Sequence, residues 1–599
     1  MQDALAALKT VDFDWTTHID SIWRDLDYDV PELQAMLRND ALLQIENLFT
    51  NRHNASPLGL VLAGPGGSGK THLLSLLRRS VLARGAFFVL VDMTDVREFW
   101  DTTLLGYIRS LAQQPLGAST QHERLLVELC AHAGARVTLE QLKGGRPPKL
   151  INVCDTLITG LRQKHSEMQE HQDVLRALVL FGSDDLNLRD LGWKWLQAIG
   201  VDDQEKLKHG FQRNAGDPRE IVRGISFLMS LIAPTLLALD QLDAIVAELQ
   251  LVTESSTEDG EKQRSAAALA IIQGIAKGLI ALRDTTARTQ TAVACLEQTW
   301  SVLAKRTLGS MHDRFHLPLL LRPVVEVAEV QRLIEQRLQS AYNSSGFKPP
   351  YTSFPFKPSF FAAQSGASPR EVLKKCEQHR LNCLRSGSVT EVGTDTKSSR
   401  VSIDPPVLRA RFDAFRAKAD IERLLADEDE DSLDKLLEAA CHALVAEHAV
   451  PADVDALVDL DFAGPGNYEP LHARVRVVYR AEAEREKHYA VRFLQKKNHL
   501  AFQARLKAAM TASGIDHSLG FRKLVLFRNG PVPPGAGSAR LIEEFHKRGG
   551  VFVEPNLDEL RDLWALSKML EQGEERMHVR DWLCAAPIVS RMPTFADAA

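Results

Sequence analysis

The pattern of apolar and polar positions changes twice near the start of the chain. An unbroken apolar run, LGLVLAG (58–64), predicts a buried strand, and THLLSLLRRSVLARG (71–85) repeats its apolar positions at helical spacing and ends in a glycine. A second apolar run, AFFVLVDM (86–93), predicts another buried strand, followed by a helix over about 96–111. This order of strand, loop, helix and strand predicts the opening of a parallel α/β sheet.

Helical patterns fill residues 115–230, after which the alternation of strands and helices returns. TLLALDQLD (235–243) predicts a strand, a long helix follows over about 265–283, and TAVACLE (291–297) and HLPLLL (316–321) predict two more strands. Helices are predicted over 324–342 and 369–385. We therefore predict an N-terminal helical segment (1–55), an α/β core (56–322) with a helical insertion at about 115–230, and a helical lid (323–386).

The second half of the chain begins with a segment of linker composition, 387–406. A helical connector (407–450) is predicted as two helices, 407–425 and 432–446. A C-terminal α/β domain (451–575) follows, with strands near 453–462, 472–480, 488–494, 522–528 and 551–554 and helices over 499–513, 538–548 and 557–571. Residues 576–599 complete the chain as a tail.

Composition agrees with several folded domains and adds little else. The chain has 599 residues, 45% of them hydrophobic and 25% charged, which is ordinary for soluble globular protein. We find no apolar run of the ~18 residues expected of a membrane span and no basic flank typical of a secretory signal. Seven scattered cysteines form no CxxC pair. These features predict a cytoplasmic protein without a membrane partner.

The strongest chemical signal is the glycine-rich stretch GPGGSGKT at 64–71. It matches GxxxxGK[ST] in full and lies between a predicted strand and a predicted helix, the context that a phosphate-binding P-loop requires. Its backbone N–H groups are expected to surround the phosphates of ATP, with Lys70 on the β- and γ-phosphates and Thr71 on Mg²⁺. The predicted nucleotide-binding residues are Gly64, Pro65, Gly66, Gly67, Ser68, Gly69, Lys70 and Thr71.

A P-loop needs a second strand that ends in an acid holding the magnesium ion. The apolar run before Asp240 meets this requirement, so Asp240 is the predicted second metal residue with Thr71. The next residue is Gln241, which can orient a water molecule but cannot accept a proton. Asp243 is the nearby carboxylate that can act as general base. A slow or gated ATPase is therefore expected.

The succession of these motifs, the segment HDRFHLPLLLRPVVEVAEVQRLIEQRL and a helix that opens with SPREVL resembles the AAA+ superfamily, over roughly residues 35–385. Its origin-recognition-like and STAND-like branches are the most similar. The resemblance implies a homo-oligomer, with Gln298 or Thr299 as a sensor of the γ-phosphate. It also implies Arg314 as an arginine finger toward a neighbouring subunit and Arg370 as a second sensor in the lid.

One departure from that family is large. About 170 residues separate Lys70 from Asp240, some hundred more than the compact family core needs. An insertion of this size fits STAND-like and KAP-like ATPases better than origin-binding ones. GTPases and DEAD-type helicases fit less well, because we find neither an NKxD-type guanine motif nor a DExD/H motif.

The C-terminal order of helix, three strands, helix and strand resembles the restriction-endonuclease-like core. Its third strand, HYAVRFLQKK, offers Gln495 and Lys497 in a QxK arrangement. No acid stands at the matching point, since Asp459 and Asp461 lie on the strand before. A Mg²⁺ site without carboxylates is unfavourable, so we predict a degenerate fold without nuclease activity.

Basic residues concentrate in the same domain. Positions 474 to 528 contain thirteen Lys/Arg and four Asp/Glu. Just upstream, DEDED (427–431) is a run of five acids. Alternate positions Arg474, Arg476 and Arg480 share one strand face. The residues that we predict to contact DNA, here called the basic stripe, are Arg474, Arg476, Arg492, Lys496 and Lys497, with Arg505, Lys507, Arg522 and Lys523 as extensions. The alternative is a solvated face, or one that docks on DEDED.

Two functions remain open on this basis. The first is an AAA+-type ATPase that couples nucleotide state to DNA handling, in a bacterial defence or mobile-element system. The second is a STAND-like switch whose ATP-dependent assembly recruits a protein partner without DNA. DNA-stimulated hydrolysis would favour the first, and nucleotide-dependent assembly without DNA would favour the second.

Overall fold

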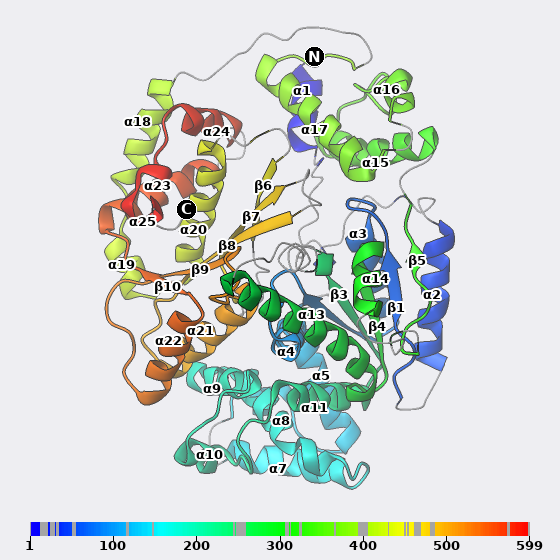
Figure 1. Ribbon diagram of the computed structural model, residues 1–599, viewed down its shortest axis with the longest axis vertical. Helices are drawn as coiled ribbons and strands as arrows, with labels where there is room; N and C mark the ends of the chain where they lie inside the picture. The colour runs from blue at the N-terminus through cyan, green and yellow to red at the C-terminus, as the bar shows by residue number, and fades with distance from the viewer. Residues whose placement is uncertain are drawn as a thin grey trace.

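The computed structural model describes most of the chain. The described residues are 2–11, 13, 22–23, 30, 35–50, 55–114, 119–145, 149–243, 246, 259–305, 311, 313–322, 326–364, 367–392, 405–428, 430–448, 451, 454–460, 469–479, 485–571 and 576–596. Most of the predicted linker (387–406), as well as Asp461 and Arg480, lies outside them. The structure has a mixed α/β fold built around two five-stranded sheets (Figure 1).

The first sheet is parallel throughout and has the order β2-β3-β4-β1-β5. Its strands are β1 (Leu60–Ala63), β2 (Phe87–Asp92), β3 (Thr235–Asp240), β4 (Thr289–Cys295) and β5 (Leu319–Leu320). Strands β1, β3 and β4 are buried at every position, as expected where helices cover both faces of a parallel sheet. The sequence predicted all five, although β5 has only two residues.

Alternate side chains of these strands pack into two separate layers of helices. On one face Leu60, Leu62 and Phe88 pack against α2 (Ala35–Thr50) and α3 (Lys70–Ala83). On the other face Val61, Val89 and Leu237 join a larger core. The helices of that core around the sheet are α4 (Phe99–Leu111), α11 (Pro218–Ser230), α13 (Asp259–Thr285) and α14 (Glu297–Lys305).

The segment predicted as a helical insertion folds as helices and forms the lower end of the molecule in Figure 1. Its helices, which lead into α11, are α5 (Gln121–Ala133), α6 (Leu139–Lys143), α7 (Lys149–Arg162), α8 (Met168–Phe181), α9 (Leu186–Leu196) and α10 (Asp203–His209). Local sequence sets several of their ends. Thr120 and Glu123 form a capping box at the start of α5, and Asp217 caps α11 with a proline in its first turn.

The lid consists of α15 (Val327–Ser345), α16 (Pro358–Ala362) and α17 (Pro369–Ser386). Ser368 and Glu371 form a capping box at the start of α17. The N-terminal helix α1 (Gln2–Thr10) packs into the lid core through Ala7 and Leu8, whereas α2 packs on the sheet. The two described helices of this segment, α1 and α2, therefore pack on two different cores.

The second sheet has the order β10-β9-β8-β7-β6. Strands β6 to β8 are antiparallel, and β9 and β10 run parallel to β8. The strands are β6 (Val454–Leu460), β7 (Ala473–Tyr479), β8 (Arg485–Phe493), β9 (Arg522–Phe527) and β10 (Val551–Val553). Two helices, α21 (His499–Ser513) and α22 (Ala536–Lys547), cover one face. All of these elements lie close to their predicted positions.

The other face of this sheet is covered by helices that come before its first strand in the sequence and by helices that come after its last strand. They are α18 (Pro405–Arg416), α19 (Ile421–Ala426), α20 (Glu430–Glu447), α23 (Leu557–Glu571), α24 (Arg576–Ala585), the 3₁₀ helix η2 (Val589–Arg591) and α25 (Pro593–Ala596). The predicted helix 407–425 is broken before Ile421, where Asp420 caps α19. The predicted tail is part of the domain, because Trp582 and Phe595 are buried in its core.

The two halves of the chain share one hydrophobic core. Leu500, Ala504 and Ala508 of α21 belong to the same buried cluster as side chains of the first sheet and the insertion, and α21 packs against α9. Helix α21 is apolar on several sides because it is covered by its own sheet and by the insertion. The C-terminal domain is therefore docked on the rest of the chain and is not separated from it.

One described helix segment, Ala266–Thr285 of α13, is long and apolar enough to cross a membrane by length and composition alone. This segment differs from the prediction that no apolar run of this length exists. Several of its side chains, among them Ile272, Ile275 and Leu279, lie in the core beside the first sheet. A buried core helix passes the same test, so this segment is weak evidence for a membrane span.

Candidate nucleotide-binding site

The glycine-rich loop 64–69 connects the buried strand β1 to helix α3, as predicted. Gly67 and Gly69 have φ values of +74° and +95°, a left-handed region that glycine adopts without steric cost. Helix α3 begins at Lys70, directly after Gly69. Its first backbone N–H groups therefore point into the loop, where a helix N-terminus favours an anion.

Lys70 extends along the loop that precedes it. Its Nζ donates to the carbonyl oxygen of Gly64 at 2.9 Å and lies 3.3 Å from that of Pro65. The same Nζ is 3.8 Å from Oδ2 of Asp243. The lysine thus lies between the loop and the acidic end of β3, where it can reach a phosphate group bound by the loop.

Thr71 and Asp240 meet across the sheet edge. The Thr71 hydroxyl donates to Oδ2 of Asp240 at 2.7 Å, and the backbone N–H of Gln241 donates to Oδ1 at 2.8 Å. Burial raises the pKa of Asp240 to about 6, against the lowering effect of these two hydrogen bonds and of Lys70. A hydroxyl and a carboxylate oxygen side by side are the hard donors that Mg²⁺ prefers, so the residues present fit this ion.

The chain itself offers few further ligands at this point. Within the described ranges, no three His, Cys, Asp or Glu side chains form a metal-binding group. A magnesium ion held here would take its remaining ligands from nucleotide phosphates and water, as is usual for this ion.

Gln241 and Asp243 lie in the turn that follows β3. Gln241 has φ +67°, an uncommon conformation for a residue with a side chain and one that is found at functional sites. Oδ1 of Asp243 accepts a hydrogen bond from the backbone N–H of Leu296 at 2.5 Å. The carboxylate of Asp243 is thereby fixed between Lys70 and the end of β4.

The lid reaches the loop through Arg370. A Cβ atom added to Gly67 would lie 2.5 Å from Cβ and 3.2 Å from Nε of Arg370, so only glycine fits there. Arg370 itself is exposed and lies in the first turn of α17. The structure therefore brings this predicted sensor beside the P-loop.

For the sensor candidates Gln298 and Thr299, the described part of the structure shows no hydrogen bond to the loop. Strand β4 ends at Cys295, and Gln298 lies exposed in the first turn of α14, with Thr299 buried beside it. This region contacts the site through backbone groups: the carbonyl oxygen of Cys295 accepts from the N–H of Gly64 at 3.2 Å, and the N–H of Leu296 donates to Asp243. A backbone donor has no signal in the sequence, so sequence reasoning missed it.

Arg314 lies at the far end of the sheet from its own P-loop. Its carbonyl oxygen accepts a hydrogen bond from Gly59, just before β1, at 2.9 Å, while the P-loop follows the other end of β1. Its guanidinium Nη2 donates to Asp284 at 3.2 Å. Arg314 therefore lies away from the P-loop of its own chain.

The prediction for the basic stripe needs correction for its three arginines, because Arg474, Arg476 and Arg492 are buried. The guanidinium of Arg476 pairs with Asp459 and Glu486. That of Arg492 pairs with Glu430 and donates to the carbonyl oxygen of Glu469. Burying an arginine is costly unless carboxylates compensate it, and here they come from the same chain, so these arginines do not form an exposed phosphate-binding face.

The alternative, docking on the acidic run, is confirmed in part. Glu430 accepts from Arg505 at 3.1 Å and from Arg492 at 3.3 Å. Lys496 lies 4.0 Å from Glu430, and the exposed Lys497 lies 3.8 Å from Glu428. Asp429, in the middle of the run, lies outside the described residues.

The QxK motif has a structural role. The side chain of Gln495 donates to the carbonyl oxygen of Asn529 at 2.8 Å and accepts from its backbone N–H at 3.1 Å. Both polar atoms are thus used to hold the loop that follows β9.

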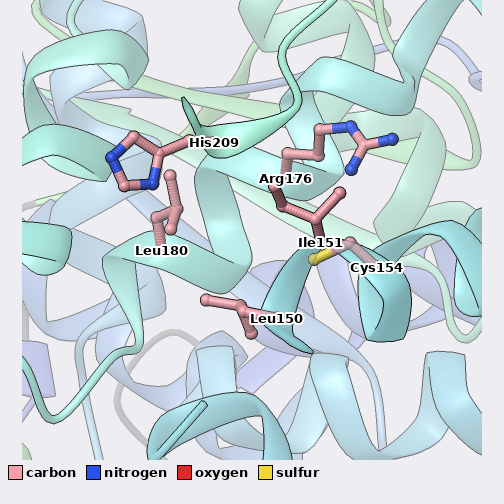
Figure 2. A pocket seen from close by; sticks show the side chains of 6 residues that line it. All are labelled: Leu150, Ile151, Cys154, Arg176, Leu180 and His209. Atoms are coloured by element: carbon pink, nitrogen blue, oxygen red, sulfur yellow. The ribbon is translucent and has the colours of Figure 1, made fainter. Parts of the chain in front are cut away.

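A small cavity lies inside the insertion, away from the P-loop (Figure 2). Figure 2 shows the His209 imidazole across from the Arg176 guanidinium, above the apolar side chains of Leu150 and Ile151. Its volume of about 10 Å³ is at the lower limit for a single water molecule. The cavity is therefore no candidate for a nucleotide or substrate.

Comparison with known proteins adds little to this geometry. Two similar solved structures are of the Aeropyrum pernix ORC2 protein. The ADP form has a TM-score of 0.32 and 10% identity over 62% of this chain and 69% of that chain. The ADPNP–ADP complexes have a TM-score of 0.29 and 12% identity over 71% and 77%. No family model and no curated protein matches the chain.

Similarity at these scores carries no argument, so the class of the protein depends on its own structure. A five-stranded parallel sheet, a glycine-rich loop after β1 and an acid after β3 are consistent with the P-loop nucleoside-triphosphatase fold. The narrower resemblance to AAA+ proteins stays a prediction from the sequence.

Proposed function

We propose that this chain is an AAA+-type P-loop protein that binds ATP with Mg²⁺ and hydrolyses it slowly. The observation that carries the proposal is the 2.7 Å hydrogen bond between Thr71 and Asp240. It joins two motifs about 170 residues apart at the edge where Lys70 also lies. In this proposal, the loop N–H groups and Lys70 hold the phosphates.

The metal residues of the proposal are Thr71 and Asp240. When bound, Mg²⁺ would neutralise charge on the phosphate oxygens. Asp243 is the proposed general base, because its carboxylate lies within 3.8 Å of the lysine that would hold the γ-phosphate. Gln241 orients water without taking up its proton, which accounts for slow turnover.

Residues outside the P-loop are proposed to assist nucleotide binding and hydrolysis. Arg370 contacts the nucleotide from the lid, an assignment supported by its position against Gly67. Gln298 or Thr299, in the first turn of α14 directly after β4, is the proposed sensor of the γ-phosphate. Arg314 completes the site of a neighbouring subunit in a homo-oligomer, which is the role left to a side chain at the opposite end of its own sheet.

The burial of the arginines favours the second function over the first. Because Arg474, Arg476 and Arg492 are paired with carboxylates, we propose a nucleotide-dependent switch that assembles and recruits a protein partner. DNA handling through Lys496 and Lys497, in a bacterial defence or mobile-element setting, is the alternative outcome of the same test.

The test measures ATP binding and hydrolysis by the full chain, alone and with duplex or single-stranded DNA, alongside mass photometry. Lys70→Ala should abolish ATP binding or turnover, because the phosphates lose the lysine of the loop. Lys305→Ala, an exposed lysine at the end of α14, is the matched control. Unchanged ATP affinity and turnover in Lys70→Ala would exclude the proposal. Nucleotide-dependent assembly without DNA supports the switch, whereas DNA-stimulated turnover supports the alternative.

Arg314→Ala tests the proposed oligomer separately. Isolated subunits should bind ATP normally, but the assembled protein should hydrolyse it more slowly, and mixing with Lys70→Ala protein should restore activity. A mixture that assembles normally and shows no rescue at any ratio would rule out a finger acting between subunits.

A further inference from the structure

A buried group of charged side chains joins the two sheets of the molecule. We call it the interface cluster and define it as Asp92, Asp95, Asp459, Arg474, Arg476, Glu486, His488 and Arg522. Asp95 lies at its centre, with its carboxylate inaccessible to solvent. Three groups of the C-terminal domain surround that carboxylate: Arg474 Nη1 at 3.0 Å, His488 Nδ1 at 2.5 Å and Arg522 Nε at 3.4 Å.

Backbone contacts make the same junction tight. Nη1 of Arg522 donates to the carbonyl oxygens of Asp95, Val96 and Gly514, each at 3.1 Å. A Cβ atom added to Gly514 would lie 1.7 Å from the carbonyl oxygen of Asp95. The loop that follows β2 is therefore clamped by the C-terminal domain through side chains and backbone together.

The clamped loop is directly beside the proposed magnesium residue. Strands β2 and β3 are parallel neighbours in which Asp92 is the register partner of Asp240. The backbone N–H of Met93 donates to the carbonyl oxygen of Asp240 at 2.9 Å. Arg474 also reaches Asp92, with Nη2 3.5 Å from its Oδ2. One arginine of the C-terminal domain thus holds the residues on both sides of the backbone group that contacts Asp240.

We propose that Arg474 is a positioning residue for Asp240, through which the C-terminal domain regulates binding of Mg·ATP at the P-loop. This inference rests on the proposed function. Docking of the domain fixes the end of β2, and β2 fixes the carbonyl of Asp240 and the direction of its side chain. Because linkage is reciprocal, binding of Mg·ATP in turn strengthens docking of the C-terminal domain. A partner that loosens the domain would release the nucleotide.

The chain provides a matched control for this idea. Arg476 lies two residues further on the same strand, is also buried and also pairs with Asp459. Its other partner is Glu486 of its own domain, and no ion pair joins it to Asp92 or Asp95 in the described part of the chain. Arg474→Gln and Arg476→Gln therefore remove equal charge from one cluster, but only the first removes the contact to β2.

Two measurements on the full-length protein test the proposal. Hydrogen exchange of the Met93 amide, without nucleotide, should be at least about tenfold faster in Arg474→Gln than in Arg476→Gln, because its loop is released. The Kd for ATP with Mg²⁺ should rise at least about fivefold in Arg474→Gln only, whereas the Kd for ATP in EDTA stays unchanged. If Arg474→Gln does not fold, Arg474→Lys serves, since lysine keeps the charge but cannot hold several carboxylates in a fork.

The possible outcomes are distinct. Equal exchange rates of the Met93 amide in the two variants would overturn the proposal. So would an unchanged Kd for Mg·ATP in Arg474→Gln when exchange of the Met93 amide is faster. If the wild-type chain binds no ATP but Met93 exchange responds to Arg474 alone, the proposed function fails and the mechanical link to Asp240 stands. A Kd that changes equally with and without Mg²⁺ shows a general structural effect and also overturns it.

Discussion

The two sheets of this protein use charged residues in opposite ways. At the edge of the first sheet, Lys70 and Asp243 lie 3.8 Å apart with side chains that keep partial contact with solvent. In the second sheet, Arg474, Arg476 and Arg492 are buried and each is paired with carboxylates. The first arrangement leaves charge for a ligand, whereas the second uses its charge to join parts of one chain.

This difference between the two sheets shows that a cluster of basic residues in the sequence indicates a binding surface only if those residues are exposed. A buried arginine without compensation costs several kcal/mol, so each buried guanidinium requires an acid from some other element. Here Asp95 comes from the loop after β2 and Glu430 from the start of α20. Part of the excess of basic residues between 474 and 528 is thus compensated by acids outside that window.

The largest test of this comparison is Glu430→Ala. It leaves Arg492 and Arg505 without their shared carboxylate, and we expect the free energy of unfolding to fall by about 3–5 kcal/mol. Urea denaturation of the full chain measures it. Asp427→Ala is the control, because Asp427 pairs with Arg423 on the exposed surface and should change stability by less than about 0.5 kcal/mol. Equal losses of unfolding free energy in the two variants would mean that Glu430 does not stabilise the protein by compensating the buried arginines.

At the first sheet, Asp243→Asn should lower turnover about 100-fold or more if Asp243 is the base. The affinity for ATP should change little, because Lys70 and the loop still hold the phosphates. Gln241→Glu should leave turnover the same or raise it. Single-turnover assays with both variants decide between the two residues, and normal hydrolysis by Asp243→Asn would place the base elsewhere.

Acid should weaken the interface cluster. Burial raises the pKa of Asp95, but His488, Arg474 and Arg522 outweigh it and lower the pKa to about 2. The folded pKa is below the usual 3.8, so the stability it contributes, about 2 kcal/mol, is present above pH ~4 and lost as pH falls toward 2. Denaturation of wild type and Asp95→Asn between pH 5 and 2 measures it, and parallel profiles would contradict the assignment.

Alkaline pH should weaken the interface cluster through His488, the ion-pair partner of Asp95. Burial lowers the pKa of His488, but Asp95 and Glu486 raise it above its usual value of 6.5. The stability from protonated His488 is therefore complete below pH ~6.5 and is lost as pH rises through the folded pKa. Urea midpoints at pH 6 and pH 9 should differ in wild type and converge in His488→Gln. A wild-type midpoint that stays constant over this range would count against a protonated His488.

The smallest effect is expected at the exposed end of the basic stripe. Lys497 is 65% exposed and lies 3.8 Å from Glu428, so Lys497→Glu should change the free energy of unfolding by less than about 0.5 kcal/mol. Fluorescence anisotropy with DNA at two salt concentrations gives the second measurement. A weaker affinity with a salt slope flatter by about one unit would identify Lys497 as a phosphate contact, and an unchanged slope would exclude it.

The sequence predicted most elements of the fold for local reasons. Continuous apolar runs identified the buried strands, and the SPREVL segment, in which Ser368 caps the helix and a proline follows, located the start of α17. The P-loop was predicted residue by residue because its glycines must adopt special backbone angles at fixed spacing. Failures occurred where partners are distant in sequence, as for α1 on the lid and the tail in the core of the C-terminal domain.

The sequence by itself determined that the chain has a phosphate-binding loop, an acid at the end of a buried strand and two α/β sheets, since these depend on residue type, spacing and periodicity. Only the tertiary structure decided which charges face solvent. Charge compensation is a matter of distance in space, and Asp95 and Arg474 meet although 379 positions separate them. No pattern along one segment contains that information, so Arg474, which the sequence placed on a surface for DNA, is instead a buried residue that joins two domains.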